Sequence, residues 1–319
     1  MLAQQYGRVP FISKKILAKF KAFESSDNRF RSAARLRQAL LREQRGWPIG
    51  HYQTVSGKRR QLGNYVATAA EQTAAFVTPE ITRLVRQEIA FREDGALVDE
   101  GRLWRNLLSS APAVFNVFGP LKLDLRLATR VMRSLCPDVV HRVNEVLFEH
   151  SPARGHPAFS HDRSAFDVLF KCRMTDGRHG FIAIELKYSE SMGEPTARTR
   201  PRYDELSRQS QLYRDPDEPA LRANPLQQFW RQHMLAHAMV ERGLYSAGRF
   251  FVVAPLFNRP AQHAIQLYRQ QLIDSPTTVS FDAAQLENVV AAIKRAGATE
   301  IAALLHERYC DYGPLDALI

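Results

Sequence analysis

The sequence predicts an α/β protein in which helices flank a mixed sheet. Three short runs rich in β-branched and aromatic residues follow one another, separated by turn residues. A helical pattern precedes them, and a long helical pattern and a fourth apolar run follow. The predicted core order is αβββαβ: helix 124–135, strands 143–149, 165–173 and 180–188, helix 224–242, and strand 249–257.

Helical patterns also occupy the region before this core. Apolar residues recur at helical spacing over 11–23, and a basic helix is predicted over 28–44. Thr78 and Pro79 have the N-cap and first-turn preferences of a further helix that runs to about residue 92. The first part of the chain is therefore expected to be basic and mainly helical.

The segments beside the core are predicted from local composition. Residues 102–110 are expected to be helical, and 111–121, rich in Phe and Pro, are expected to form a loop. Asp124 is the expected cap of the following helix. The tail predicts two helices, 282–296 and 298–308.

A long segment, 189–223, separates the third predicted strand from the long helix. It is rich in arginine and interrupted by prolines. Segments of this length and composition act as lids or binding loops, or lie on the surface as irregular loops. Its position just after the third strand makes a substrate clamp and a mobile surface loop the two alternatives.

Positive charge is concentrated at the start of the chain. Residues 1–60 contain 14 Lys and Arg against three acids, a balance of +11 that equals the formal net charge of all 319 residues. A neutral body with a cationic arm favours a polyanionic partner, above all nucleic acid, because phosphate binding needs only positive charge. Solvated helix faces and an acidic lipid surface are the alternatives.

Other features exclude several classes of protein. No stretch approaches the roughly 20 apolar residues that span a bilayer, and the first 23 residues lack the apolar centre of a secretory signal. The three cysteines form no CxxC pair, so a zinc site or a disulfide framework is not expected. A cytoplasmic protein with no membrane partner is the resulting expectation.

Two of the predicted strands carry a short polar constellation. Asp167 opens one strand, and Glu185 and Lys187 close the next. If these strands pair antiparallel, the start of the first lies beside the end of the second. Glu185 and Lys187 share one face of their strand and Leu186 points to the other. Carboxylates and an ammonium at one strand end suit a hard divalent cation and an activated water.

This constellation and its surroundings resemble the PD-(D/E)XK nuclease superfamily, which has the restriction-endonuclease-like fold. Asp167 matches the family's acid and Glu185-Leu186-Lys187 its (Asp/Glu)-x-Lys, while Phe166 replaces the frequent proline. The order αβββαβ is also that of the family core. Stretches within 75–260 resemble a bacterial branch of restriction endonucleases; they lie at 115–121, 148–152 and 163–167.

The resemblance implies a chemistry and a domain organisation. Mg²⁺, for which Mn²⁺ substitutes, would be held by Asp167, Glu185 and the carbonyl of Leu186. Lys187 would orient or help deprotonate a water. The expected reaction is cleavage of DNA phosphodiesters, with a restriction or defence role. Residues 1–105 would form the basic N-terminal region and 106–319 the nuclease domain with its C-terminal helices.

Glu149 is the expected third acid and metal ligand of the site. It ends the strand that should pair antiparallel with the strand opening at Asp167, so it should reach the same edge. An exposed acid at a strand end is the alternative. Asp124 is a weaker candidate, because family members often take their first acid from that helix.

Substrate-binding residues are predicted in two places. On the long helix, Arg231 and Gln232 lie three and four residues after Gln228, and each shares a face with Gln228 that could position the scissile phosphate. Lys58, Arg59 and Arg60 belong to the cationic arm. Lys171 and four histidines, His150, His156, His161 and His179, are treated as surface or substrate-contact residues.

Two other functions remain compatible with the sequence. The chain could be a catalytically inactive nucleic-acid-binding scaffold that keeps the fold, or a nuclease directed to RNA. Cleavage of both strands of a duplex would favour a homodimer, and a defence role would imply a defence-system partner. The sequence shows no interface that decides between these alternatives.

Overall fold

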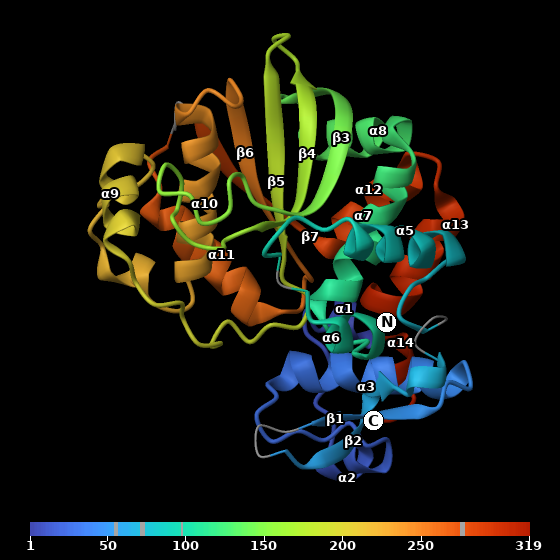
Figure 1. The fold of residues 1–319 in the computed structure, drawn as a ribbon. Helices are drawn as coiled ribbons and strands as arrows, with labels where there is room; N and C mark the ends of the chain where they lie inside the picture. The colour runs from blue at the N-terminus through green and yellow to red at the C-terminus, as the bar shows by residue number, and fades with distance from the viewer. Residues whose placement is uncertain (54–56, 71–73, 97, 275–277) are drawn as a thin grey trace.

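The computed structural model describes residues 1–53, 57–70, 74–96, 98–274 and 278–319. A five-stranded mixed sheet lies at the centre, in the order β3-β4-β5-β6-β7 (Figure 1). The first three strands are antiparallel, and β6 and β7 continue the sheet parallel to β5. The strands are β3 (Val140–His150), β4 (Phe166–Met174), β5 (His179–Leu186), β6 (Ala247–Ala254) and β7 (Val279–Gln285). The predicted α/β class and the order of the core are confirmed.

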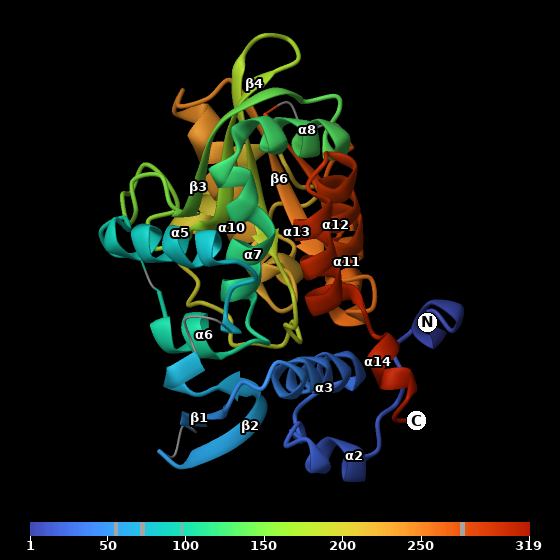
Figure 2. The same cartoon turned by 90° about the vertical axis from the view of Figure 1, so that its right-hand side faces the viewer.

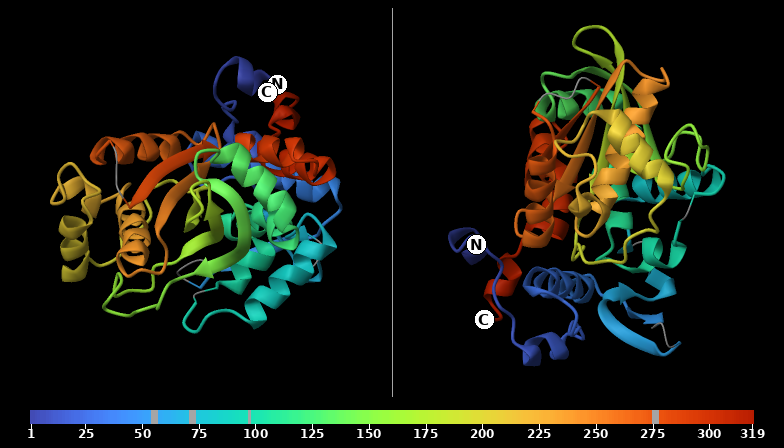
Figure 3. Two further views of the ribbon diagram at one scale, coloured as in Figure 1. Left: turned by 90° about the horizontal axis from the view of Figure 1, so that it is seen from above. Right: turned by 90° about the vertical axis from the view of Figure 1, so that its left-hand side faces the viewer.

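Helices cover both faces of the sheet, as the view from above in Figure 3 shows. One face packs against α7 (Ser110–Leu123), α8 (Leu125–Leu135), α12 (Leu286–Arg295) and α13 (Thr299–Leu305). The other packs against α9 (Pro201–Ser210), α10 (Gln227–Glu241) and α11 (Arg259–Gln271). Side chains alternate along β5, so Ile184 enters the first core and Ala183 the second. Both faces of the strand are buried, which explains its nearly continuous apolar run.

The loop predicted over 111–121 is wrong: these residues belong to α7, which is buried along most of its length. A helix buried on all sides has no polar face, so its sequence shows no amphipathic period. Pro112 lies in the first turn, where its missing N–H costs nothing, and Pro120 lies in the last turn. Composition alone therefore suggested a loop.

The start of the predicted helix 282–296 is also wrong. Residues up to Gln285 form β7, and α12 begins at Leu286. The short edge strand is held by its ladder to β6, a long-range pairing that local composition does not reveal. After α13, a π-helical turn (His306–Cys310) and the short α14 (Gly313–Asp316) complete the tail.

The N-terminal region packs beneath one end of the sheet (Figure 2). It contains α1 (Leu2–Gln5), α2 (Lys14–Lys19), α3 (Arg29–Gln44), a hairpin of β1 (Ile49–Gln53) and β2 (Arg59–Val66), and a 3-10 turn (Thr68–Ala70). Helix α5 (Pro79–Ala90) begins as Thr78 and Pro79 predict, and α6 (Glu100–Arg105) follows.

The outcomes in this region are mixed. Helix α3 confirms the prediction for 28–44, whereas the helix over 11–23 shrinks to the six residues of α2, after which Lys21 adopts φ +52°. The β1–β2 hairpin was not predicted. Buried residues of α3 belong to the same apolar cluster as the sheet, and the boundary at 105/106 stays a prediction.

Several arginines of the cationic arm have structural roles. Arg35 is buried and pairs with Asp27 at 2.6 Å. Arg37, also buried, donates to the carbonyls of Asp311 and Glu307, and Arg42 donates to the carbonyl of Gly63. These guanidinium groups link α3 to the tail and to the hairpin. The charge of the arm is therefore smaller on the surface than the sequence count suggests.

The arginine-rich segment 189–223 is packed against the body. It contains α9 and a 3-10 turn (Pro219–Arg222). Tyr203 and Leu206 of α9 are buried in the core that includes α10, and Arg222 lies 4.9 Å over the ring of Trp230. Among the described residues, no helix is long and apolar enough to cross a membrane.

Candidate active site

The ends of β4 and β5 bring the predicted constellation together. Val168 pairs with Ile184 in the antiparallel register, which places Asp167 beside Glu185. Asp167 Oδ2 accepts a hydrogen bond of 2.7 Å from the backbone N–H of Leu186. The Leu186 side chain is buried in the opposite core, as the alternation of the strand predicts.

Glu185 and Lys187 form a buried ion pair. Their residues are only 3% and 6% exposed, and Lys187 Nζ lies 2.6 Å from Glu185 Oε1. Lys187 lies just past β5, and its backbone N–H bonds to the carbonyl of Val253 on β6. Desolvation makes such pairs costly unless further hydrogen bonds satisfy both groups.

Two glutamines of α10 supply these additional hydrogen bonds. Gln228 donates to Glu185 Oε1 at 2.7 Å and accepts from Lys187 Nζ at 2.7 Å. Gln232 donates to Glu185 Oε2 at 2.5 Å and to the carbonyl of Ala165 at 2.9 Å. One turn of α10 therefore orients both charged groups of β5. The predicted proximity of this helix to the strand end is present in the structure.

Glu149 reaches the same edge from β3. The register places it opposite Asp167, between the pairs Phe148–Val168 and His150–Phe166. Its φ of +48° lies in the left-handed region, which costs a residue with a Cβ roughly 1 kcal/mol or more. Burial, together with the charge of Glu185, raises the pKa of Glu149 to about 7.

The surroundings of Asp167 and Lys187 also raise the pKa values of these two residues. Burial raises the pKa of Asp167 well above its ordinary value, and the charges of Glu185 and Glu149 add to this effect. Burial alone would lower the pKa of Lys187, but the charges of Glu185 and Glu190 outweigh it and raise that pKa. One lysine faces several acids, so the cluster has a deficit of positive charge.

The cluster opens into a cavity of about 500 Å³. The acids and the α10 glutamines line one part of it. The loop between β3 and β4 supplies Arg154 and Arg163, the segment before α9 supplies Arg198 and Arg200, and α10 supplies Arg231. A negative centre surrounded by guanidinium groups suits a phosphate ester that approaches together with a cation.

The donor set fits a hard divalent cation in its chemistry. Carboxylate oxygens are the ligands that Mg²⁺ prefers, and the raised pKa of Asp167 marks a place where added positive charge is stabilising. Gln232 Oε1 is buried and has no hydrogen-bond partner among the residues that the structure describes. Among the described residues, however, no three Asp, Glu, His or Cys side chains are already grouped as a metal site. Asp167, Glu185 and Glu149 would hold the ion after a local adjustment.

A second buried carboxylate, Asp162, faces the same cavity and was not predicted. Its Oδ1 accepts from Ser160 and from Ser164, and its Oδ2 accepts from Ser164, Tyr203 and Arg231 at 2.6–2.9 Å. Burial would raise its pKa, but these hydrogen bonds lower it overall. Arg231 is therefore held by Asp162, which makes its expected role as a direct phosphate contact indirect at most.

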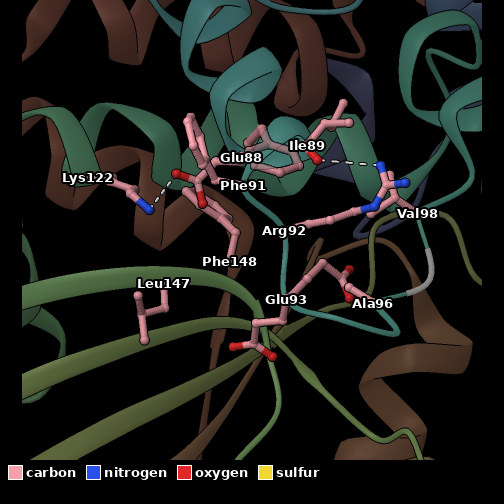
Figure 4. A pocket seen from close by; sticks show the side chains of 12 residues that line it. Glu88, Ile89, Phe91, Arg92, Glu93, Ala96, Val98, Lys122, Leu147 and Phe148 are labelled. Atoms are coloured by element: carbon pink, nitrogen blue, oxygen red, sulfur yellow. Dashed lines mark hydrogen bonds and ion pairs between the residues drawn. The ribbon is translucent and has the colours of Figure 1, made fainter. Parts of the chain in front are cut away.

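A second acid that the sequence analysis missed, Glu93, lies close to Glu149. It pairs with His150 at 2.5 Å and with Arg154 at 3.2 Å. Glu93 and Glu149 also line a smaller pocket of about 220 Å³ (Figure 4). In that pocket Lys122 pairs with Glu88 at 2.5 Å and lies over the ring of Phe148. Contacts from the loop after α5 could not be found by strand patterns alone.

Other predicted residues lie away from the cavity. Lys58, Arg59 and Arg60 are in or next to β2 and line none of the cavities described here, and Arg60 pairs with Glu24 at 3.1 Å. Lys171 pairs with Glu145 at 2.8 Å. Asp124 caps α8 through the N–H groups of Arg126 and Leu127. Of the remaining histidines, His156 bonds to the N–H of Ala158 and His179 to Arg173, while His161 is exposed.

A mixed sheet with Asp167 beside Glu185 and Lys187 at neighbouring strand ends has the arrangement that the sequence resemblance implied for a nuclease. A family model described as the PD-(D/E)XK nuclease superfamily matches residues 25–311, and the chain belongs to that superfamily. Nucleases of this superfamily act on nucleic acids and generally use divalent metal ions. Comparisons with curated proteins and with solved structures gave no match.

Proposed function

We propose that this protein is a Mg²⁺-dependent nuclease that hydrolyses DNA phosphodiester bonds, with its centre at Asp167, Glu185, Lys187 and Glu149. The observation that carries the proposal is the buried Glu185–Lys187 pair, oriented by Gln228 and Gln232 and facing Asp167. Buried charges are costly, and Glu185 of this pair lines a cavity rather than a packed core. Such an arrangement is typical of a site built for catalysis.

Each residue has a distinct proposed role. Asp167, Glu185 and Glu149 would hold the cation through their carboxylates. The backbone carbonyl of Leu186 would be the fourth ligand from the protein. The bound ion would lower the pKa of a water and neutralise charge on the scissile phosphate. Lys187 would orient that water and stabilise the negative charge that develops on the phosphate oxygens. Gln228 and Gln232 position the charged groups without reacting.

The substrate proposal rests on charge. Five arginines line the cavity, and arginine binds phosphate oxygens in a bidentate manner. The residues of 58–60 lie outside the cavity, so any contact they make with DNA would be remote from the scissile bond. A restriction or defence role, a homodimer and a defence-system partner are consistent with a DNA-cleaving enzyme and rest on the sequence resemblance.

Cleavage of plasmid and single-stranded DNA by the purified protein in Mg²⁺, Mn²⁺ and EDTA tests the proposal. We expect metal-dependent cleavage that falls by about 10²–10⁴-fold in Lys187→Ala and in Asp167→Ala, the range for loss of a group that acts on protons. Lys171→Ala and Asp176→Ala are the matched controls, because both residues lie outside the cavity. Equal cleavage by all five proteins would contradict the assignment. Binding of DNA without any cleavage would favour the inactive scaffold.

A further inference from the structure

We propose that the site takes an unpaired DNA strand, which runs through the cavity and continues toward the N-terminal hairpin. This inference rests on the proposed nuclease function and specifies the form of its substrate. It comes from five observations: the depth of the site, the contacts that tie its rim together, the arginines without partners, the cavities beyond the acids, and an aromatic pair on the hairpin.

The reacting groups lie at the bottom of a recess. Glu185, which lines the cavity of about 500 Å³, and its ion-pair partner Lys187 are almost completely buried. A cavity of this volume is within the size range of small-molecule sites. A paired and stacked duplex is too wide and stiff to follow a recess of this size. A single strand can present one phosphate at the bottom while its neighbours follow the walls.

The rim of the recess is tied together on one side. The loop between β3 and β4 is bonded to the start of α9 and to the residue before it. Arg200 donates to the carbonyl of His161 at 2.5 Å, and Arg202 donates to that of Phe159 at 3.1 Å. Tyr203 joins the same two segments through Asp162. These contacts join both walls beside the strand ends and oppose sideways entry of a duplex.

Most arginines along the recess already have partners. Arg154 pairs with Glu93, Arg231 with Asp162, and Arg200 donates to a backbone carbonyl. Within the described part of the chain, the side chains of Arg163 and Arg198 are exposed and make no hydrogen bond or ion pair. These two guanidinium groups are therefore available for substrate phosphates.

The path continues on the other side of the acids. Glu149 and Asp167 also line a cavity of about 200 Å³, which contains Arg102. Arg102 in turn lines a further cavity of about 500 Å³ between the core and the hairpin. In the described ranges the Arg102 side chain pairs with no acid. The first two cavities therefore share Glu149 and Asp167, and the last two share Arg102, so unpaired arginines lie on both sides of the acids.

An aromatic pair lies at the far end of this course. The rings of Tyr52 and Tyr65 stack at 5.7 Å between centroids and line the last cavity. Grooves that bind single strands combine positive charge along the backbone with aromatic faces for the bases. The hairpin, which the sequence analysis did not predict, would then hold the bases of the strand leaving the site.

Binding measured in EDTA tests the inference independently of cleavage. A labelled single strand is compared with a duplex of the same sequence whose ends are closed by hairpin loops. We expect the single strand to bind at least about tenfold more tightly. Arg163→Ala, Arg198→Ala and Arg102→Ala should each weaken that binding by about tenfold. Each should also reduce the slope of log affinity against log salt by about 0.7.

Arg178→Ala removes the same charge from the exposed β4–β5 turn and should leave the single-strand affinity unchanged. A melting curve for each variant checks the fold, and charge reversal by Arg198→Glu should enlarge the loss. Equal or tighter binding of the closed duplex, or variants that bind like the wild type, would overturn the inference. Cleavage of closed duplex that Asp167→Ala abolishes would keep the nuclease proposal and reject the strand preference. Tighter binding of the single strand, without cleavage in any metal, would keep the strand preference and reject the nuclease proposal.

Discussion

Two buried carboxylates face the same cavity and are stabilised in opposite ways. Asp162, in the loop after β3, accepts five hydrogen bonds, four from side chains and one from a backbone N–H, and has a lowered pKa. Asp167, at the start of β4, accepts one backbone hydrogen bond, faces Glu185 and Glu149, and has a raised pKa. The first carboxylate is satisfied by the protein alone. The second has a shortage of positive charge that a cation would relieve, so the contrast separates a structural acid from a candidate catalytic one.

The largest stability effect is expected where the satisfied carboxylate is removed. Asp162→Ala leaves Arg231 and the hydroxyl of Tyr203 without their acceptor. Breaking a buried ion pair by removing one partner costs about 3–5 kcal/mol. Urea unfolding measures the loss, and Asp176→Ala, on an exposed turn, is the control. A loss below about 1 kcal/mol would mean that Asp162 does not hold the cavity wall.

The lowered pKa of Asp162 also predicts how the free energy of unfolding depends on pH. The pKa of Asp162 is lower in the folded chain, so its contribution is present above the unfolded value of about 3.9. That contribution disappears as the pH falls through the folded pKa. The difference in unfolding free energy between wild type and Asp162→Ala should therefore be full at pH 7 and shrink below pH about 4. A difference that stays constant down to pH 3 would contradict the network.

A smaller effect is expected from the glutamine that orients Glu185. Gln232→Leu removes the donor to Glu185 Oε2 and to the carbonyl of Ala165. Leaving buried acceptors unsatisfied costs about 1–3 kcal/mol, and a misplaced Glu185 should lower the cleavage rate as well. Urea unfolding and cleavage assays are compared with Gln270→Leu, an exposed position on α11. Full activity in Gln232→Leu would show that α10 does not position the strand end.

The elements that were predicted correctly are those whose own residues show a periodic pattern of apolar side chains. Strands β3 to β6, α8 and α10 carry clear periodicity, and the antiparallel pairing of β4 with β5 then brings Asp167 beside Glu185. Helix α7 gave no period because it is buried on all sides, and β7 depends on its ladder to β6. Elements held by tertiary contacts have little local signature.

The same distinction applies to the site. The strand ends and the spacing of residues on α10 could be inferred from the sequence. The proximity of Gln228 and Gln232 to Glu185 could therefore be predicted. The positive φ of Glu149, the approach of Glu93 and the network of Asp162 depend on loops and on a distant helix. The count of charged residues was the least reliable predictor of a nucleic-acid-binding surface. The guanidinium groups of Arg35, Arg37 and Arg42 make hydrogen bonds inside the protein instead of facing solvent.

The most direct test of the account compares the stability of wild type and Asp167→Asn without and with Mn²⁺ at pH 8. Without metal, the variant should be more stable by about 1 kcal/mol, because it removes one of three mutually repelling carboxylates. Saturating Mn²⁺ at about 100 times its dissociation constant should stabilise wild type by roughly 2.7 kcal/mol and the variant by much less, which reverses the order. A variant that is less stable than wild type without metal, together with no response of wild type to Mn²⁺, would show that Asp167 is a structural acid like Asp162.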